Sequence, residues 1–228
     1  IKMKKKDSTQ ENLKAFEQGL TKAELLLEKN QNKLIVIVSS FVVLFSLFFA
    51  FKKFYKEPRE MRAVNEIYLA ERAFEKNNYD EALNGNEEFP GFLEIIELYS
   101  DTKIGNLSNY YSGICYFKLN EPEKSIEFLE NFKSNDEILI SIANGVIGDS
   151  FSELNQNEDA LDYYIKASKL NNNNFTTPIY LMKAGKIAQL LSDYNKALSL
   201  YSKIKKDYPN SKEAQNIDKY ITMIKSKI

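Results

Sequence analysis

Two stretches of the sequence echo each other: residues 148–170 read GDSFSELNQNEDALDYYIKASKL, and residues 185–209 read GKIAQLLSDYNKALSLYSKIKKDYP. Their first glycines, Gly148 and Gly185, are 37 positions apart, and an alanine and a tyrosine follow at matching places in both. Small residues let two helices approach closely, and an aromatic ring fills the gap between them. A repeat of this length is typical of helix-turn-helix units that stack into an array.

Earlier copies of the unit precede this pair. Gly113 lies 35 positions before Gly148 in a similar setting. Residues 78–83 read NYDEAL and match DYNKAL at residues 193–198, although NGNEEFPG at residues 84–91 interrupts the second helix of that first copy. Four copies at this period predict a tetratricopeptide (TPR) type of solenoid.

The predicted fold is therefore all-α, with a TPR-like domain over residues 57–228. Ala160 and Ala197 are expected in tight helix–helix contacts. Residues 211–227 are expected to form a capping helix, because their outer face is polar, as the end of a solenoid requires. The pattern is degenerate: the chain has no Trp, and only the last copy ends in a proline, Pro209.

A second feature is the apolar run LIVIVSSFVVLFSLFFAF at residues 34–51, which contains no charged residue. As a helix it would be about 27 Å long, close to the ~30 Å thickness of a bilayer core. Lysines flank both ends, so we expect a single transmembrane helix. Its serines, Ser39, Ser40 and Ser46, are expected to contact a membrane partner, since small polar residues favour close helix packing in lipid.

Residues 1–33 are expected to be a cytoplasmic segment with a short amphipathic helix. The capping-box pattern at residues 8–11 predicts that this helix begins near residue 9. An apolar stripe follows at alternating spacings of three and four: Leu13, Phe16, Leu20, Ala23 and Leu27. The stripe fits either a helix on the membrane surface or a contact helix for a partner. Lysines near the two ends of the apolar run are balanced, and only those at residues 2–6 favour a cytoplasmic N-terminus.

Composition argues against several classes of function. The chain has no His, 31 basic and 32 acidic residues, and a net charge of -1. Without a basic field, nucleic acid is a poor partner. Cys115 stands in an apolar setting and is expected to be a buried hydrophobe, and Asp149 with Glu153 is a helical i, i+4 pair of the kind found on solvated faces. We expect no enzyme activity, cofactor, metal site or small-molecule substrate.

TPR solenoids bind protein segments along the face formed by the first helix of each repeat. Alignment on the small residues predicts the lining of that groove: Ile67, Phe74, Tyr110, Ile114, Phe117, Asp149, Glu153, Met182 and Lys186. This mostly apolar lining suits an extended or helical protein segment. The alternative is that these side chains pack on one another or on the insertion at residues 84–91.

The order of parts and two of the repeat stretches resemble a known family. GFLEIIELYSDTKIGNLSNYYSGICYFKL at residues 91–119 and GDSFSELNQNEDALDYYIKASKLNNNNFTTP at residues 148–178 resemble bacterial membrane-anchored TPR proteins, as distant relatives of the ancillary SecYEG translocon subunit family (YfgM-like). The resemblance implies a bacterial inner-membrane protein with its N-terminus in the cytoplasm and its TPR domain in the periplasm.

The same resemblance implies two partners, the SecYEG translocon and a membrane-anchored periplasmic chaperone of the prolyl-isomerase type. It implies a non-enzymatic part in handing newly translocated proteins to chaperones. The alternative function is a TPR scaffold for another cell-envelope assembly, such as division, secretion or outer-membrane biogenesis.

Overall fold

The chain divides into two units, Ile1–Pro58 and Arg59–Ile228, and each is described by itself. This computed structural model describes the backbone of residues 2–170 and 172–228. It describes the side chains of residues 14, 16, 21, 28–170 and 172–228.

The first unit is built on helix α1 (Lys2–Phe51), which is followed by a short π-helix, η1 (Lys52–Lys56). The expected helix start near residue 9 is wrong: α1 begins at Lys2, because the lysine-, glutamate- and leucine-rich segment around the capping-box pattern favours helix throughout. In the predicted stripe the side chains of Leu13, Leu20, Ala23 and Leu27 lie outside the described residues. The side chain of Phe16 is 68% exposed.

The apolar run at residues 34–51 lies within α1 and is exposed along its whole length. By length and composition, one described helical stretch is long and apolar enough to cross a membrane, and it contains this run. The expectation of one long apolar helix ahead of helical repeats is confirmed.

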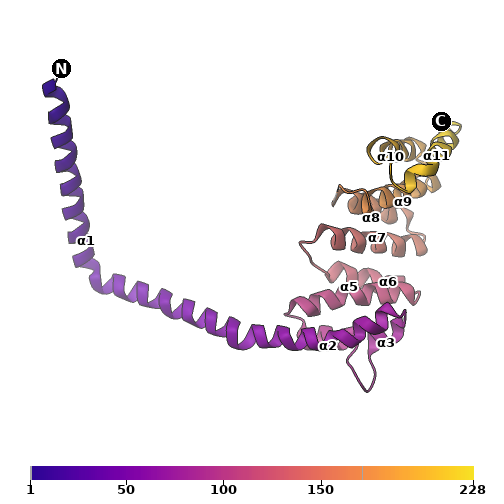
Figure 1. The fold of residues 1–228 in the computed structure, drawn as a ribbon, viewed down its shortest axis with the longest axis horizontal. Helices are drawn as coiled ribbons and strands as arrows, with labels where there is room; N and C mark the ends of the chain where they lie inside the picture. Colours follow the sequence, from indigo (N-terminus) through magenta and orange to yellow (C-terminus); the bar gives the residue numbers. More distant parts are fainter. Residues whose placement is uncertain (1, 171) are drawn as a thin grey trace. The chain divides into compact units, whose positions relative to one another are not determined.

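The second unit consists of helices that stack in chain order (Figure 1). Within the described residues 59–170 and 172–228 they form repeated pairs followed by an end cap. The first pair is α2 (Glu57–Glu75) with α3 (Tyr79–Asn84) and α4 (Phe92–Tyr99), and the next are α5 (Lys103–Lys118) with α6 (Pro122–Asn131), α7 (Glu137–Glu153) with α8 (Asn157–Leu170), and α9 (Thr176–Leu190) with α10 (Tyr194–Asp207). The predicted all-α solenoid of TPR type is confirmed.

The same turn joins the two helices of every repeat. Its central residue has a positive φ of about 60° each time, at Asn77, Asn120, Asn155 and Ser192. In the third repeat the Asn155 N–H donates to the Ser152 carbonyl at 3.0 Å, and the next N–H donates to the Phe151 carbonyl at 2.9 Å. Such bonds satisfy carbonyls that the end of a helix leaves unpaired. Because the turn recurs, a position can be named by its distance from this residue.

Seven residues before the turn residue, the first helix of each repeat carries a glycine or an alanine. These positions are Ala70, Gly113, Gly148 and Gly185. A Cβ atom on Gly148 would lie only 2.8 Å from the Tyr164 ring, so the glycine is what lets α7 and α8 come this close. Ala160 and Ala197, on the second helices, are fully buried, as expected.

The insertion in the first repeat splits its second helix in two. Helix α3 ends at Asn84, Gly85 adopts a φ of 73° and pairs with Pro90, and α4 resumes at Phe92. The Phe92 ring is fully buried and stacks on Tyr111 with centroids 4.9 Å apart. Helix α4 thus completes the packing that the interrupted helix begins.

The C-terminal end of the solenoid is covered by a short cap. A 3-10 turn, η2 (Glu213–Asn216), leads into helix α11 (Ile217–Lys225), so the expected capping helix over residues 211–227 begins six residues later than predicted. Ile217 and Ile224 are buried against α9 and α10, while the opposite side of α11 is exposed. The capping role fits a helix with one apolar and one polar face.

Candidate functional site

The predicted groove residues fall at matching places in the repeats. Counted back from the turn residue, Ile67, Tyr110 and Met182 occupy position ten, and Ile114, Asp149 and Lys186 occupy position six. Phe74 and Phe117 occupy position three, and Glu153 lies next to it at position two. The first helices of successive repeats therefore present these positions in register.

Position ten is largely buried. Ile67 is 3% exposed and Tyr110 is 8% exposed, so neither offers much surface to a partner. In the third repeat this position is Gly145, and the ring of Tyr180 from the next repeat lies directly where a Cβ atom would be. The position faces the neighbouring repeat, which is why large side chains there join the core.

Phe74 joins an aromatic cluster in the first repeat. Its ring centroid lies 5.6 Å from that of Tyr79, 5.1 Å from Tyr111 and 6.3 Å from Phe92. Phe89, inside the insertion, packs against the same cluster. In this repeat the side chains pack on one another and on the insertion, which is the alternative that the sequence left open.

Asp149 has partners within the protein. Its carboxylate accepts bonds from the Lys183 ammonium at 2.6 and 2.7 Å and from the Tyr164 hydroxyl at 2.6 Å. Burial, and then the charge and hydrogen bond of Asp149, raise the pKa of Tyr164 well above its ordinary value. The carboxylate thus ties α7, α8 and α9 together, and its exposed neighbour Glu153 makes no convergent pair with it.

Part of the predicted groove remains at the surface. Glu153 and Lys186 are exposed, and Phe117 is half-buried with the Lys118 ammonium 5.9 Å from its ring centroid. Ile114 and Met182 are half-buried against the middle and C-terminal core clusters. These five predicted groove residues, which keep some exposed surface on the first helices, are named here the inner-face residues.

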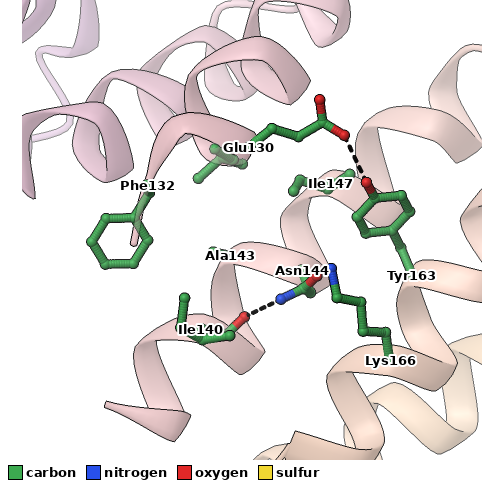
Figure 2. A pocket seen from close by; sticks show the side chains of 9 residues that line it. Glu130, Phe132, Ile140, Ala143, Asn144, Ile147, Tyr163 and Lys166 are labelled. Atoms are coloured by element: carbon green, nitrogen blue, oxygen red, sulfur yellow. Dashed lines mark hydrogen bonds between the residues drawn. The ribbon is translucent and has the colours of Figure 1, made fainter. Parts of the chain in front are cut away.

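A second feature, which sequence reasoning missed, arises because α6 is short. Helices α6, α8 and α10 all begin two residues after their turn residue, but α6 ends four residues, or one turn, earlier than the others. The missing turn leaves a hollow of about 360 Å³ beside Phe132, named here the Phe132 hollow (Figure 2). The shorter spacing from Gly113 to Gly148, 35 instead of 37, was its only sequence signal.

The Phe132 hollow has an apolar lining and a polar rim. Leu129, Phe132, Ala143 and Ile147 are almost fully buried beneath it, with Ile140 half-buried beside them. Across the rim the Tyr163 hydroxyl donates to Glu130 Oε1 at 2.7 Å, as Figure 2 shows. Burial, and then the hydrogen bond and charge of Glu130, raise the pKa of Tyr163 to about 12. The Tyr163 hydroxyl is therefore protonated at neutral pH and can donate this bond.

Phe132 also lines a second hollow, of about 520 Å³, together with Lys103, Lys133 and Leu139 among others. Asn106 holds the loop that forms it. The Asn106 amide donates to the Lys133 carbonyl at 2.7 Å and accepts from the Lys133 N–H at 2.9 Å. The loop after α6 is thus fixed by side-chain bonds instead of helical ones.

The remaining residues singled out from the sequence are the three serines of the apolar run and Cys115. Ser39, Ser40 and Ser46 are exposed on α1, and the Ser40 hydroxyl donates to the Val36 carbonyl at 2.8 Å. Cys115 is fully buried, and burial raises its thiol pKa to about 12. It is therefore the buried hydrophobe that its apolar setting predicts, because a thiol with that pKa is protonated at neutral pH.

Comparisons with known proteins agree with this architecture. The family model described as "Tetratricopeptide repeat" matches residues 180–211, which cover most of α9 and all of α10. No curated protein sequence matches the chain.

Among solved structures, the crystal structure of MamA is 17% identical with a TM-score of 0.50, and the match covers 69% of this chain and 93% of that one. A putative kinesin light chain from Podosopora anserina, with nearly identical TPR-like repeats, is 10% identical with a TM-score of 0.55, and the match covers 73% of this chain and 86% of that one. At these identities the likeness concerns the fold alone.

Proposed function

We propose that this chain is a non-enzymatic protein-interaction module held at a bacterial inner membrane by residues 34–51. The observation that carries the proposal is the set of inner-face residues on a TPR-type solenoid. Ile114, Phe117 and Met182 retain apolar surface, while Glu153 and Lys186 add one acidic and one basic group. Such a mixture suits an extended or helical segment of another protein, with the charges fixing its direction.

In the finer form of the proposal, the N-terminus is cytoplasmic and the solenoid is periplasmic. The module is an accessory subunit of the SecYEG translocon and passes newly translocated proteins to a membrane-anchored chaperone of the prolyl-isomerase type. The support is the resemblance of residues 91–119 and 148–178 to the ancillary translocon subunit family, together with the order of apolar segment and repeats. Ser39, Ser40 and Ser46 would face the translocon within the membrane, because small polar side chains allow close helix approach.

Topology is tested by reporters fused after Ile228. A reporter that works only in the periplasm should be active, and a cytoplasmic reporter at the same place should be silent. The reverse result would put the solenoid in the cytoplasm and end the chaperone part of the proposal.

Partner binding is tested by purifying the full chain in mild detergent and measuring co-purifying proteins. Phe117→Ala should lower recovery of a soluble or chaperone partner, since a buried aromatic anchor contributes about 1–2 kcal/mol or more. Phe175→Ala is the matched control, because Phe175 is 71% exposed, lies at the start of α9 and is not one of the inner-face residues. Equal losses in both variants would argue against the inner face, and recovery of division or outer-membrane biogenesis proteins instead of SecYEG would favour the alternative scaffold.

A further inference from the structure

The C-terminal end of the apolar run carries a small open depression on the helix surface. It has a volume of about 370 Å³ and is lined by Phe49, Ala50, Lys52, Lys53, Phe54 and Glu57. Ala50 has the shortest side chain of these six residues, so we take it as the floor of the depression, with the rings of Phe49 and Phe54 also in the lining. This depression is named here the Ala50 notch.

The chemistry of the Ala50 notch changes along the helix. Phe49 and Ala50 belong to the uncharged run of α1, and Lys52 and Lys53 open the π-helix η1 directly after it. Lys56, one turn further, is also exposed. The depression therefore has an apolar part, at Phe49 and Ala50, and a cationic part next to it, at Lys52 and Lys53.

The π-helical turn is held in place by ring stacking and by a wider backbone bond. Phe51 stacks on Tyr55 with centroids 5.0 Å apart and an interplanar angle of 19°. The Glu57 N–H donates to the Lys52 carbonyl, five residues back, which is the bond of a π-turn. Single π-turns inserted in α-helices occur frequently at functional sites.

We propose that the Ala50 notch binds one anionic phospholipid, with the headgroup phosphate at Lys52 and Lys53 and the first acyl carbons over Ala50 between the two phenylalanine rings. Two lysines against one glutamate favour an anion, and Glu57 can accept a hydrogen bond from a headgroup hydroxyl. A soluble phosphate would use only the lysines, whereas half of the lining is apolar and continuous with the apolar run. The inference rests on the proposed membrane anchor.

The test uses the full chain, delipidated in detergent, with phosphatidylglycerol and phosphatidylcholine titrated separately and bound lipids counted by native mass spectrometry. Each lysine near a phosphate contributes about a fivefold preference, so Lys52→Gln with Lys53→Gln should weaken phosphatidylglycerol binding about 25-fold and leave phosphatidylcholine unchanged. The control pair, Lys29→Gln with Lys33→Gln, removes two exposed lysines at the other end of the apolar run and should change binding less than twofold. Equal losses in both pairs would show general charge attraction and overturn the site.

A further variant tests the notch apart from its charge. Ala50→Phe fills the floor but keeps both lysines, so it should abolish the strongest bound phosphatidylglycerol while the chain stays folded, because Ala50 is exposed. Glycerol phosphate in excess should not displace the lipid, and displacement would reassign the notch to soluble phosphates.

Extraction of membranes with alkaline carbonate separates this inference from the anchor. Release of the wild-type chain would refute the anchor and the notch together. Retention of the chain, with unchanged lipid binding in the Lys52 and Lys53 double variant, would refute the notch alone.

Discussion

Gly148 offers a direct test of how closely the two helices of a repeat approach. A Cβ atom there would lie 2.8 Å from two carbons of the Tyr164 ring and 3.3 Å from the Ala160 carbonyl oxygen. Ordinary contact needs about 3.4 Å or more, so the ring would have to move by roughly 0.6 Å. It has little freedom to do so, because Tyr164 is 4% exposed and its hydroxyl is bonded to Asp149 at 2.6 Å.

The expected cost of Gly148→Ala follows from two opposed terms. Overpacking a well-packed core costs about 1–3 kcal/mol, while replacing glycine by alanine inside a helix gains up to about 1 kcal/mol. We expect a net loss of about 1–2 kcal/mol in the free energy of unfolding, measured by urea denaturation of residues 57–228.

A double-mutant cycle with Tyr164→Ala identifies the cause of that loss. Without the ring the added methyl group has space, so Gly148→Ala in the Tyr164→Ala background should be neutral or stabilising by up to about 1 kcal/mol. The coupling between the two sites should then be about 1–3 kcal/mol, within the range for residues in direct contact. A Gly148→Ala variant as stable as the wild type, or the same loss in both backgrounds, would refute the close approach of α7 and α8.

Other predictions concern the same domain. Changing Ala160 or Ala197 to Phe should cost about 1–3 kcal/mol or more of unfolding free energy in urea, since both are fully buried, and an unchanged melting temperature would contradict the repeat register. Lys183→Met should cost about 0.5–1 kcal/mol, because its partly exposed ion pair with Asp149 is lost, and Asp149→Asn should then cost little more in that background. Burial raises the pKa of Tyr164, so above its ordinary pKa the folded state keeps a proton that the unfolded state releases. The free energy of unfolding, measured in urea, should be level up to about pH 10 and fall above it, by at most about 1.4 kcal/mol per pH unit for such a tyrosine, and a rise would contradict the assignment.

The repeat architecture could be predicted because it depends on a few strict steric requirements. Gly113, Gly148 and Gly185 occupy sites where even a methyl group meets a side chain of the facing helix, so these positions are marked in the sequence. The turns were less visible. The turn residue with positive φ is asparagine in three repeats and serine, Ser192, in the fourth. The sequence therefore does not mark it consistently, and the shared turn is recognised only from its φ angle and its backbone hydrogen bonds.

The length of α6 could not be predicted, because its sequence does not oppose a longer helix. Residues 129–133 read LENFK and contain no proline or glycine. The helix nevertheless ends at Asn131, because two contacts outside α6 hold the residues that follow it. Asp136 caps α7 by accepting from the Ile138 and Leu139 N–H groups, and Asn106 bonds both backbone groups of Lys133. The Asp136 cap belongs to the next helix and the Asn106 bonds come from α5, so neither can be seen in the sequence of α6. Helix α6 is therefore one turn shorter than α8 and α10, and the Phe132 hollow lies where that turn is missing.

For the predicted groove, the repeat period determines which helix each residue lies on, but not how exposed its side chain is. A period equates positions within successive repeats, and it correctly placed all nine predicted residues on the first helices. It does not give the angle between one repeat and the next. That angle turns position ten toward the neighbouring repeat, where the Tyr180 ring covers Gly145 and where Ile67 and Tyr110 are buried. Positions six to two are less enclosed, so a partner that follows the inner face would contact Phe117 and Lys186, and among the residues at position ten it would contact Met182, which is half-buried.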